Sequence, residues 1–250
     1  MPGRFGELDY RFPRPLSEGL IKARPNRFLM DVERDGTIFR CHCPATGRIG
    51  DLVFEDVPCL LSESSNKERK TQCTVEAISL DQVEVTNKSW IGINQTMTNR
   101  YLEHFILAGQ LEGMLGRSGD VWREVRFGRS RIDFKVSETF LEVKTPLTEI
   151  PHSPHMKYRS QPPMTSFDRL IKHFGDLAAS IGKGKRAIVL LCYQFDAEPF
   201  RPPPMDRSNE KIEEAAAAAE KSGVESWQVN LRIDTLGVGL IRYFRLHLFD

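Results

Sequence analysis

The segment RAIVLLCYQF, residues 186–195, limits the choice of fold more than any other part of the chain. Its centre, from Ala187 to Tyr193, is an unbroken apolar run, which is typical of a strand buried on both faces of a sheet. The run is also far shorter than the roughly 20 apolar residues that a membrane helix needs. We therefore predict a sheet with helices packed on it and no membrane partner.

Segments with helical and strand patterns alternate on both sides of this run. Apolar residues from Tyr101 to Met114 follow a helical spacing that Gly116 ends, and residues 208–223 read as a second, alanine-rich helix. A further helix is predicted from Thr165 or Ser166 to Ile181. The other predicted strands are WREVRF, RIDFKV, FLEVKT, ESWQVNLRID and LIRYFRLHLF. The order α-β-β-β-α-β-α-β-β predicts a mixed α/β domain.

The chain from about Leu20 to Ile93 has short strand patterns and no long helix. RFLMDVER and TIFRCHC flank the dipeptide Asp35-Gly36, which is typical of a hairpin with a tight primed turn. PATGRIGDLVF is rich in turn residues, and TQCTVEAIS, QVEVTNK and SWIGIN are further candidate strands. Many short strands at close spacing predict a small barrel or a sandwich.

The cysteines, at positions 41, 43, 59, 73 and 192, lack the spacing of a disulfide framework, which suits a reducing compartment. Cys41 and Cys43 share one face of a predicted strand while His42 points to the other, so buried cysteines are favoured over a zinc site. The first residues, MPGRFGELDYRFPRPL, lack an apolar segment and indicate an extended arm rather than a secretory signal. We expect an intracellular, cytoplasmic protein.

The net charge of +1 means that any binding of nucleic acid has to come from local patches. One patch lies between Arg117 and Lys135, where Arg and Lys outnumber the acids. A solvated hairpin face is the alternative interpretation of the same residues.

The predicted hairpin from residues 131 to 145 carries a pattern with chemical potential. Glu142 and Lys144 share one face of their strand, and Asp133 can lie near Glu142 on the neighbouring strand. Two adjacent carboxylates repel unless a cation joins them, and Mg²⁺ takes one or two protein carboxylates. A lysine beside that cation can orient a water or stabilise charge on a phosphate. The alternative is an exposed ladder of ion pairs, which contributes little.

These segments resemble the SfsA family, which is named for a sugar fermentation stimulation protein of bacteria. RSRIDF followed by LEVKTPL looks like the central signature of that family. LIKARPNRFLMDV, HCPATG, INQTMTNR and RLIKHF resemble other family segments in the same order, over roughly residues 20–195.

The resemblance implies an α+β or mixed α/β fold with two parts after an N-terminal arm of residues 1–19. An OB-like β-barrel would cover residues 20–95, and a restriction-endonuclease-like α/β domain with a mixed central sheet and a PD-(D/E)xK core would cover residues 96–250. It further implies a DNA-binding, nuclease-like protein with Mg²⁺ or Mn²⁺ as cofactor, with Asp133, Glu142 and Lys144 at the catalytic positions. RNA as a partner and a homodimer stay open.

The resemblance also suggests the residues that contact nucleic acid and metal. Glu103 or His104 would add a metal ligand, since His104 stands where the family has a glutamate. Single strands bind OB barrels through basic grooves and aromatic stacking. The candidate nucleic-acid-binding residues are Arg24, Arg27, Arg48, Arg129, Arg131, Lys172 and His173, with Phe28 beside them.

Departures from the family pattern favour a second hypothesis. Ala45 replaces the asparagine of the family's HCPNTG turn, and Leu170 replaces the glycine of its RGxKHL helix. Together with His104, these changes fit a non-catalytic, regulatory nucleic-acid-binding protein that keeps the nuclease fold.

Overall fold

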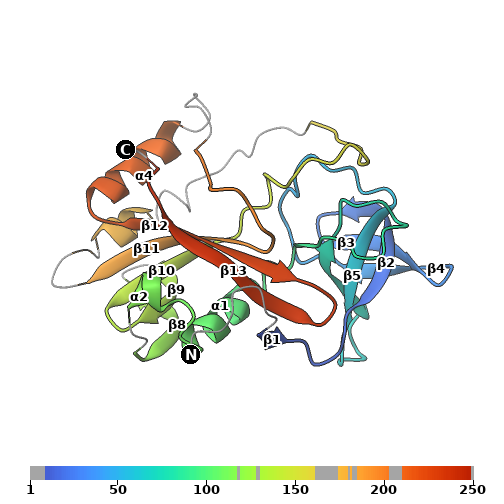
Figure 1. Cartoon of the computed structure of the whole chain (residues 1–250), viewed down its shortest axis with the longest axis horizontal. Helices are drawn as coiled ribbons and strands as arrows, with labels where there is room; N and C mark the ends of the chain where they lie inside the picture. Colours follow the sequence, from blue (N-terminus) through green and yellow to red (C-terminus); the bar gives the residue numbers. More distant parts are fainter. Residues whose placement is uncertain are drawn as a thin grey trace.

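The structure is a computed structural model that describes residues 9–116, 119–127, 130–160, 174–179, 181, 185–202 and 210–248. Two sheets lie side by side, a barrel on the right of Figure 1 and a larger open sheet on the left.

The barrel is built from antiparallel strands in the order β4-β3-β2-β5-β6-β7. An additional parallel pairing at His42 and Thr74 joins β4 to β6 and closes the sheet on itself. The strands are β2 (Ser17–Asn26), β3 (Leu29–Arg34), β4 (Thr37–His42), β5 (Val57–Glu63), β6 (Cys73–Ile78) and β7 (Ile91–Gly92). Closure removes the free edges that an open sheet of short strands would expose.

Local sequence explains the first hairpin of the barrel. Asp35 and Gly36 both have positive φ, at 53° and 74°, as a primed two-residue turn requires, and they join β3 to β4 in register. Cys41 and Cys43 point into the barrel core, and all five cysteines are buried and free. Burial raises the pKa of the Cys41 thiol to about 12, which keeps it protonated and unreactive at neutral pH.

Two parts of the barrel differ from the sequence prediction. β5 was not predicted as a separate strand. QVEVTNK was predicted as a strand and is instead a run of turns and bends, with Val83 and Val85 exposed. The prediction was wrong because alternation alone does not place a strand when neither of its faces meets a core.

The second sheet is mixed and has the order β1-β13-β12-β11-β10-β9-β8. β10, β11 and β12 are mutually parallel, and the remaining neighbours are antiparallel. The strands are β1 (Tyr10–Arg11), β8 (Val121–Phe127), β9 (Ser130–Val136), β10 (Thr139–Lys144), β11 (Arg186–Tyr193), β12 (Glu225–Ile233) and β13 (Gly237–Leu246). The apolar run of residues 187–193 is the central strand β11, as predicted.

Helices cover both faces of this sheet. α1 (Thr98–Leu107) and the short α2 (Glu112–Leu115) pack on one face, and Gly116 ends α2 with a φ of 75°. On the other face, residues 174–179 are helical and join α4 (Glu210–Lys221) in a smaller core. The observed order of elements from α1 onward follows the predicted α-β-β-β-α-β-α-β-β, except that the single helix predicted from Tyr101 to Met114 is two helices, α1 and α2, with a turn at residues 108–111 between them. Residues 161–173 lie outside the described part of the chain.

The hydrophobic cores of the barrel and of the larger sheet meet at the end of β11. Cys192 belongs to the core under α1, whereas the adjacent Tyr193 and Phe195 belong to the barrel core. Gln194, between them, donates from Nε2 to the carbonyl oxygen of Asn94 (3.1 Å) and to Oγ1 of Thr98 (3.0 Å). The chain between the barrel and α1 is therefore fastened to the central strand.

Within the predicted N-terminal arm, residues 10–16 lie against the larger sheet. Tyr10 and Arg11 form the edge strand β1 against β13 of the larger sheet, and β2 of the barrel already begins at Ser17. The sequence analysis missed this pairing because it joins residues more than 200 positions apart. None of the helices in the described ranges has the length and apolar character needed to span a bilayer.

Candidate functional site

The hairpin of β9 and β10 opens at Asp133. The ladder pairs Val136, Lys135 and Phe134 with residues 139–141 and ends there. Beyond it, Oδ2 of Asp133 accepts a hydrogen bond from the backbone N–H of Val143 at 2.8 Å. The carboxylate thus takes the place of a backbone carbonyl, and the two strands fork around it.

Asn99, in the first turn of α1, holds the other oxygen of this carboxylate. Its Nδ2 donates to Oδ1 of Asp133 at 2.9 Å. Val143, which donates to Oδ2, lies between Glu142 and Lys144. The fork therefore brings the Asp133 carboxylate to the backbone of the strand that carries Glu142 and Lys144, and we call it the Asp133 fork.

Glu142 and Lys144 form an ion pair on one side of β10. Glu142 is only 3 % exposed and lies opposite Val189 of β11 on the side of the smaller core, whereas the lysine side chain is 27 % exposed. Burying a carboxylate is costly unless it has a hydrogen-bonding or charged partner, and here the ammonium group of Lys144 is that partner. The pair is more deeply placed than the exposed ladder that the alternative interpretation requires.

Glu103 and His104 lie on different sides of α1. Glu103 follows Asn99 by one helical turn, on the same side, and its carboxylate pairs with Arg123 of β8 at 3.1 Å. The His104 ring packs edge-to-face on Tyr10 of β1, with centroids 5.5 Å apart. Within the described residues, no three His, Cys, Asp or Glu side chains form a metal-binding group, so the four predicted ligands do not come together as a set.

Of the four nucleic-acid-binding residues predicted outside the barrel, Arg131 is the one that the structure describes. Its guanidinium forms an ion pair with Glu124 at 3.0 Å, and both side chains are well exposed. Glu124 itself has a φ of 55° and, in the register of β8 with β9, lies opposite Asp133. Arg129, Lys172 and His173 lie outside the described residues.

The three arginines predicted on the barrel do come together. Arg24, Arg27 and Arg48 line one hollow of about 810 Å³, which we call the arginine hollow. Arg159 and Thr148, from the segment that follows β10, line it as well. The remaining lining residues are Ala23, Asn26, Thr46, Gly47, Leu52, Val53 and Phe54. Every described residue of the lining is therefore basic, polar or apolar, and none is acidic.

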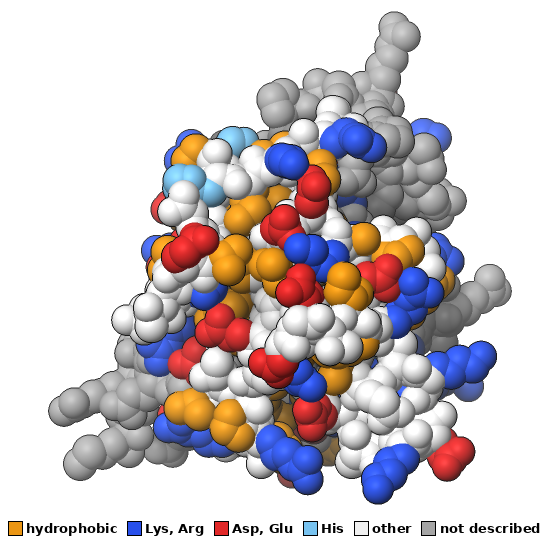
Figure 2. Space-filling model, turned by 90° about the vertical axis from the view of Figure 1, so that its right-hand side faces the viewer, with side chains coloured by type: hydrophobic (Ala, Val, Ile, Leu, Met, Phe, Trp, Pro, Cys, Tyr) orange, Lys and Arg blue, Asp and Glu red, His pale blue; other side chains and the backbone are white. Residues whose placement is uncertain are grey.

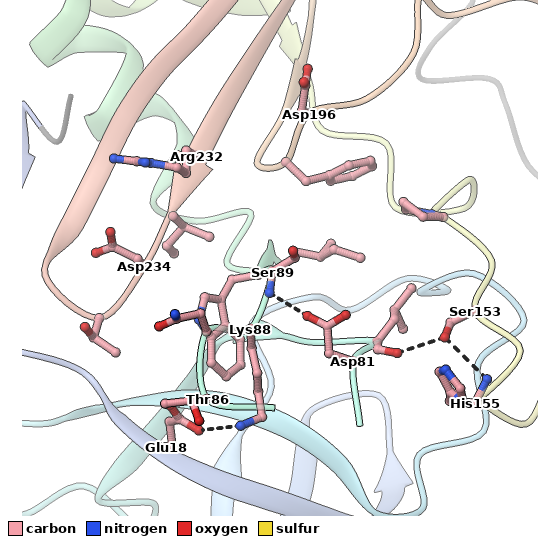
Figure 3. Close-up of a pocket in the computed structure, with 18 of the residues that line it drawn as sticks. Glu18, Asp81, Thr86, Lys88, Ser89, Ser153, His155, Asp196, Arg232 and Asp234 are labelled. Carbon is pink, nitrogen blue, oxygen red and sulfur yellow. Dashed lines mark hydrogen bonds and ion pairs between the residues drawn. The ribbon is translucent and has the colours of Figure 1, made fainter. Parts of the chain in front are cut away.

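A larger cleft of about 1070 Å³ lies where the segment 80–91, the loop 151–155 and the turn between β12 and β13 meet (Figure 3). Its acids outnumber its lysine and arginine, and the buried Lys88 is paired with Glu18 at 3.1 Å. Asp81 accepts from the backbone N–H of Ser89 at 2.6 Å. An excess of negative charge disfavours phosphate, so the smaller arginine hollow is the better anion site.

The surface of the barrel side carries mixed charge. Figure 2 shows Lys and Arg side chains interspersed with Asp and Glu on this face. Such mixing agrees with the net charge of +1 and means that local geometry, rather than a broad basic face, has to select an anion.

Sequence reasoning missed three residues of these sites. Asn99 was seen only as part of an asparagine-rich segment, and nothing in the sequence pairs it with Asp133. Thr148 and Arg159 lie in a proline-rich loop, and their approach to the barrel depends on a contact between distant segments, the bridge from Leu52 to Tyr158.

Comparisons with known proteins agree with this architecture. Residues 23–93 match the family model described as SfsA N-terminal OB domain, and residues 96–237 match the sugar fermentation stimulation protein RE domain. A sugar fermentation stimulation protein homolog of Synechococcus is 30 % identical, over 93 % of this chain and 94 % of the relative. A homolog of Pseudomonas aeruginosa is 30 % identical, over 93 % and 97 %.

One solved structure has the same fold. It is described as the SfsA of Pyrococcus furiosus in complex with Ca²⁺, and it superimposes with a TM-score of 0.73 at 21 % identity, covering 98 % of this chain and 100 % of that one. Because OB domains commonly bind nucleic acids, the N-terminal match suggests a nucleic-acid-binding protein. The matches cover both halves of the chain, and this protein belongs to the SfsA family, the sugar fermentation stimulation proteins.

Proposed function

We propose that this protein binds nucleic acid, DNA in the first place, and hydrolyses phosphodiester bonds at the Asp133 fork. The single observation that supports this best is the fork itself. Asn99 and the amide of Val143 fix the Asp133 carboxylate against the strand that carries the buried Glu142 and its partner Lys144, and this supports the roles that the resemblance implies for the three residues.

The donor set fits a divalent cation. Mg²⁺ binds through one or two carboxylates and keeps several waters, so the fork does not need a third acidic ligand. The Pyrococcus furiosus relative is described as a Ca²⁺ complex, which supports a divalent-cation site in this family. Asp133 and Glu142 would hold Mg²⁺ or Mn²⁺. Glu103, which lies one helical turn after Asn99 on α1, would be the candidate for a further ligand. The bound ion would lower the pKa of a coordinated water and neutralise charge on the phosphate.

The chain's own groups have separate roles in this proposal. Asn99 and the Val143 amide keep the Asp133 carboxylate oriented, since each donates a hydrogen bond to one of its oxygens. Lys144, held beside Glu142, orients the attacking water or stabilises the negative charge that develops on the phosphate.

A non-catalytic nucleic-acid-binding protein is the second candidate. The ion pair between Glu103 and Arg123 favours it, since that pair engages the acid closest to the fork on α1. This candidate predicts salt-sensitive binding without cleavage.

The decisive experiment compares wild type with Asp133→Ala and Lys144→Ala on single- and double-stranded DNA and on RNA, with Mg²⁺ or Mn²⁺. We expect each substitution to reduce cleavage by about 100-fold or more, because each removes a charge that acts on the transition state. Glu138→Ala, which removes an exposed acid from the turn of the same hairpin, should leave the rate unchanged.

Cleavage that survives Asp133→Ala would rule out the assigned roles. Binding without cleavage in the wild type, under every metal condition, would select the second candidate. Mn²⁺ binding to the wild type and to Asp133→Ala, measured by calorimetry, tests the cation site independently of activity.

A further inference from the structure

Two of the four guanidinium groups of the arginine hollow build its wall. The Nη2 atom of Arg24 donates to the carbonyl oxygens of Ala45 (2.7 Å) and Gly47 (3.0 Å), and so fixes the turn after β4. Arg48 pairs with Asp51 at 2.6 Å and donates from Nε to the carbonyl oxygen of Gly50 at 3.1 Å. These two residues shape the hollow and keep part of its positive charge.

The other two guanidinium groups are available to a ligand. Arg27 and Arg159 are exposed, and neither guanidinium has an ion-pair or hydrogen-bond partner among the described residues. Arg27 lies over the ring of Phe28, 4.6 Å from its centroid, and Phe28 is 44 % exposed. An arginine whose N–H groups have no partner among the described residues, next to a partly exposed aromatic ring, is a combination that can bind a phosphate and stack on a base.

The hollow is tied to the Asp133 fork by a short, fixed length of chain. Thr148 in the lining follows Lys144 by four residues, so their Cα atoms are at most about 14 Å apart. This stretch is anchored at both ends, because Gln95 donates to the carbonyl oxygen of Thr145 (2.7 Å) and Gly50 to that of Leu147 (2.6 Å). A stacked strand covers that distance with about four nucleotides.

We propose that the arginine hollow binds the phosphate backbone of a single nucleic-acid strand that runs along residues 145–148 to the Asp133 fork. This proposal rests on the proposed function. Arg27 and Arg159 bind phosphates, and Phe28 stacks on a base. The volume of about 810 Å³ is that of a small-ligand site, which suits a few nucleotides of one strand better than the full width of a duplex.

Binding in EDTA tests the hollow without cleavage. A fluorescein-labelled oligo(dT) of 12 nucleotides and a duplex of equal length would be titrated with the full-length protein at several KCl concentrations. Arg27→Ala and Arg159→Ala should each weaken single-strand binding about tenfold and lower the slope of log K against log salt by about 1. Phe28→Ala should weaken it about fivefold or more, without changing the salt slope.

Two controls separate this role from a general loss of charge. Arg245→Ala removes an exposed arginine of β13 outside the hollow and should leave binding unchanged. Arg27→Lys keeps the charge and should retain the salt slope. Unchanged melting temperatures would show that each variant is folded.

The outcomes distinguish the two proposals. If the wild type binds single strands and the hollow variants behave as Arg245→Ala does, or if the duplex binds equally well, the hollow proposal is wrong and the proposed function stands. If the wild type binds no nucleic acid at low salt, both are wrong.

Discussion

At the scale of single residues, buried polar groups mark the places where the structure depends on one side chain. Glu76 of β6 is only 6 % exposed, and it accepts hydrogen bonds from Oγ of Ser62 and Nδ2 of Asn94. Burial raises the pKa of this carboxyl, and the two hydrogen bonds oppose that effect only in part. The group sits where the barrel meets the chain leading to α1.

The raised pKa of Glu76 predicts a pH dependence of stability. The folded protein binds this proton more tightly than the unfolded chain, so the contribution to stability is complete below pH 4.5, the ordinary value, and is lost as the pH rises through the folded pKa. In urea unfolding from pH 4 to 8, the free energy of unfolding of the wild type should therefore decline relative to that of Glu76→Gln.

Glu68→Gln, at an exposed position of the same barrel, provides the matched control and should show no such trend. A difference between wild type and Glu76→Gln that stays constant across this pH range would contradict the assignment.

At the scale of elements, β1 depends on a residue without a side chain. Gly237 lies opposite Arg11, and a Cβ at this position would be 2.1 Å from the backbone oxygen of Tyr10. Gly237 therefore allows the N-terminal segment to lie against β13, where it continues with a hydrogen bond from Phe12 to Leu236.

Gly237→Ala should displace β1 and lower the free energy of unfolding by about 1–3 kcal/mol, because backbone groups of the edge lose their partners. Hydrogen exchange of the amides of Phe12 and Leu16 should become faster in this variant. Gly47→Ala, where a Cβ meets no atom within 4 Å, should leave exchange of these amides unchanged. Equal protection in both variants would show that β1 tolerates the side chain.

Much of this level of structure could be predicted from the sequence, because its determinants are local. Asp35-Gly36 specifies its turn, and the apolar run of β11 specifies a central strand. The pairing of β1 with β13 and the strand wrongly predicted at residues 82–88 show the limit of prediction from local sequence. Both depend on whether a segment distant in the sequence packs against the residues in question. The same limit applies to the sites. Asp133, Glu142 and Lys144 lie on one hairpin and could be proposed from their spacing, whereas Asn99 and Arg159 reach their sites only through tertiary contacts.

At the scale of the whole molecule, the barrel and the sheet are joined through their interiors. β11 supplies side chains to both main cores, and Gln194 fastens the connecting chain. Gly92 allows this approach, since a Cβ there would lie 2.4 Å from Oε1 of Gln194.

We therefore expect one cooperative unfolding transition rather than two. Calorimetry should give a calorimetric enthalpy equal to the van't Hoff enthalpy, the test of two-state behaviour. Gln194→Ala should lower the melting temperature of that one transition, because it leaves the Thr98 hydroxyl without its partner. Two resolved transitions in the wild type would mean that the barrel and the sheet unfold independently.

The stretch from Thr145 to Leu147, which is held by hydrogen bonds at both ends, has a consequence for the products of the proposed cleavage. Because both ends of this stretch are fixed, the distance between the arginine hollow that binds the strand and the Asp133 fork that would cleave it stays constant. The protein would then work as a ruler, and a strand held by its end would be shortened in steps of uniform length whatever its sequence.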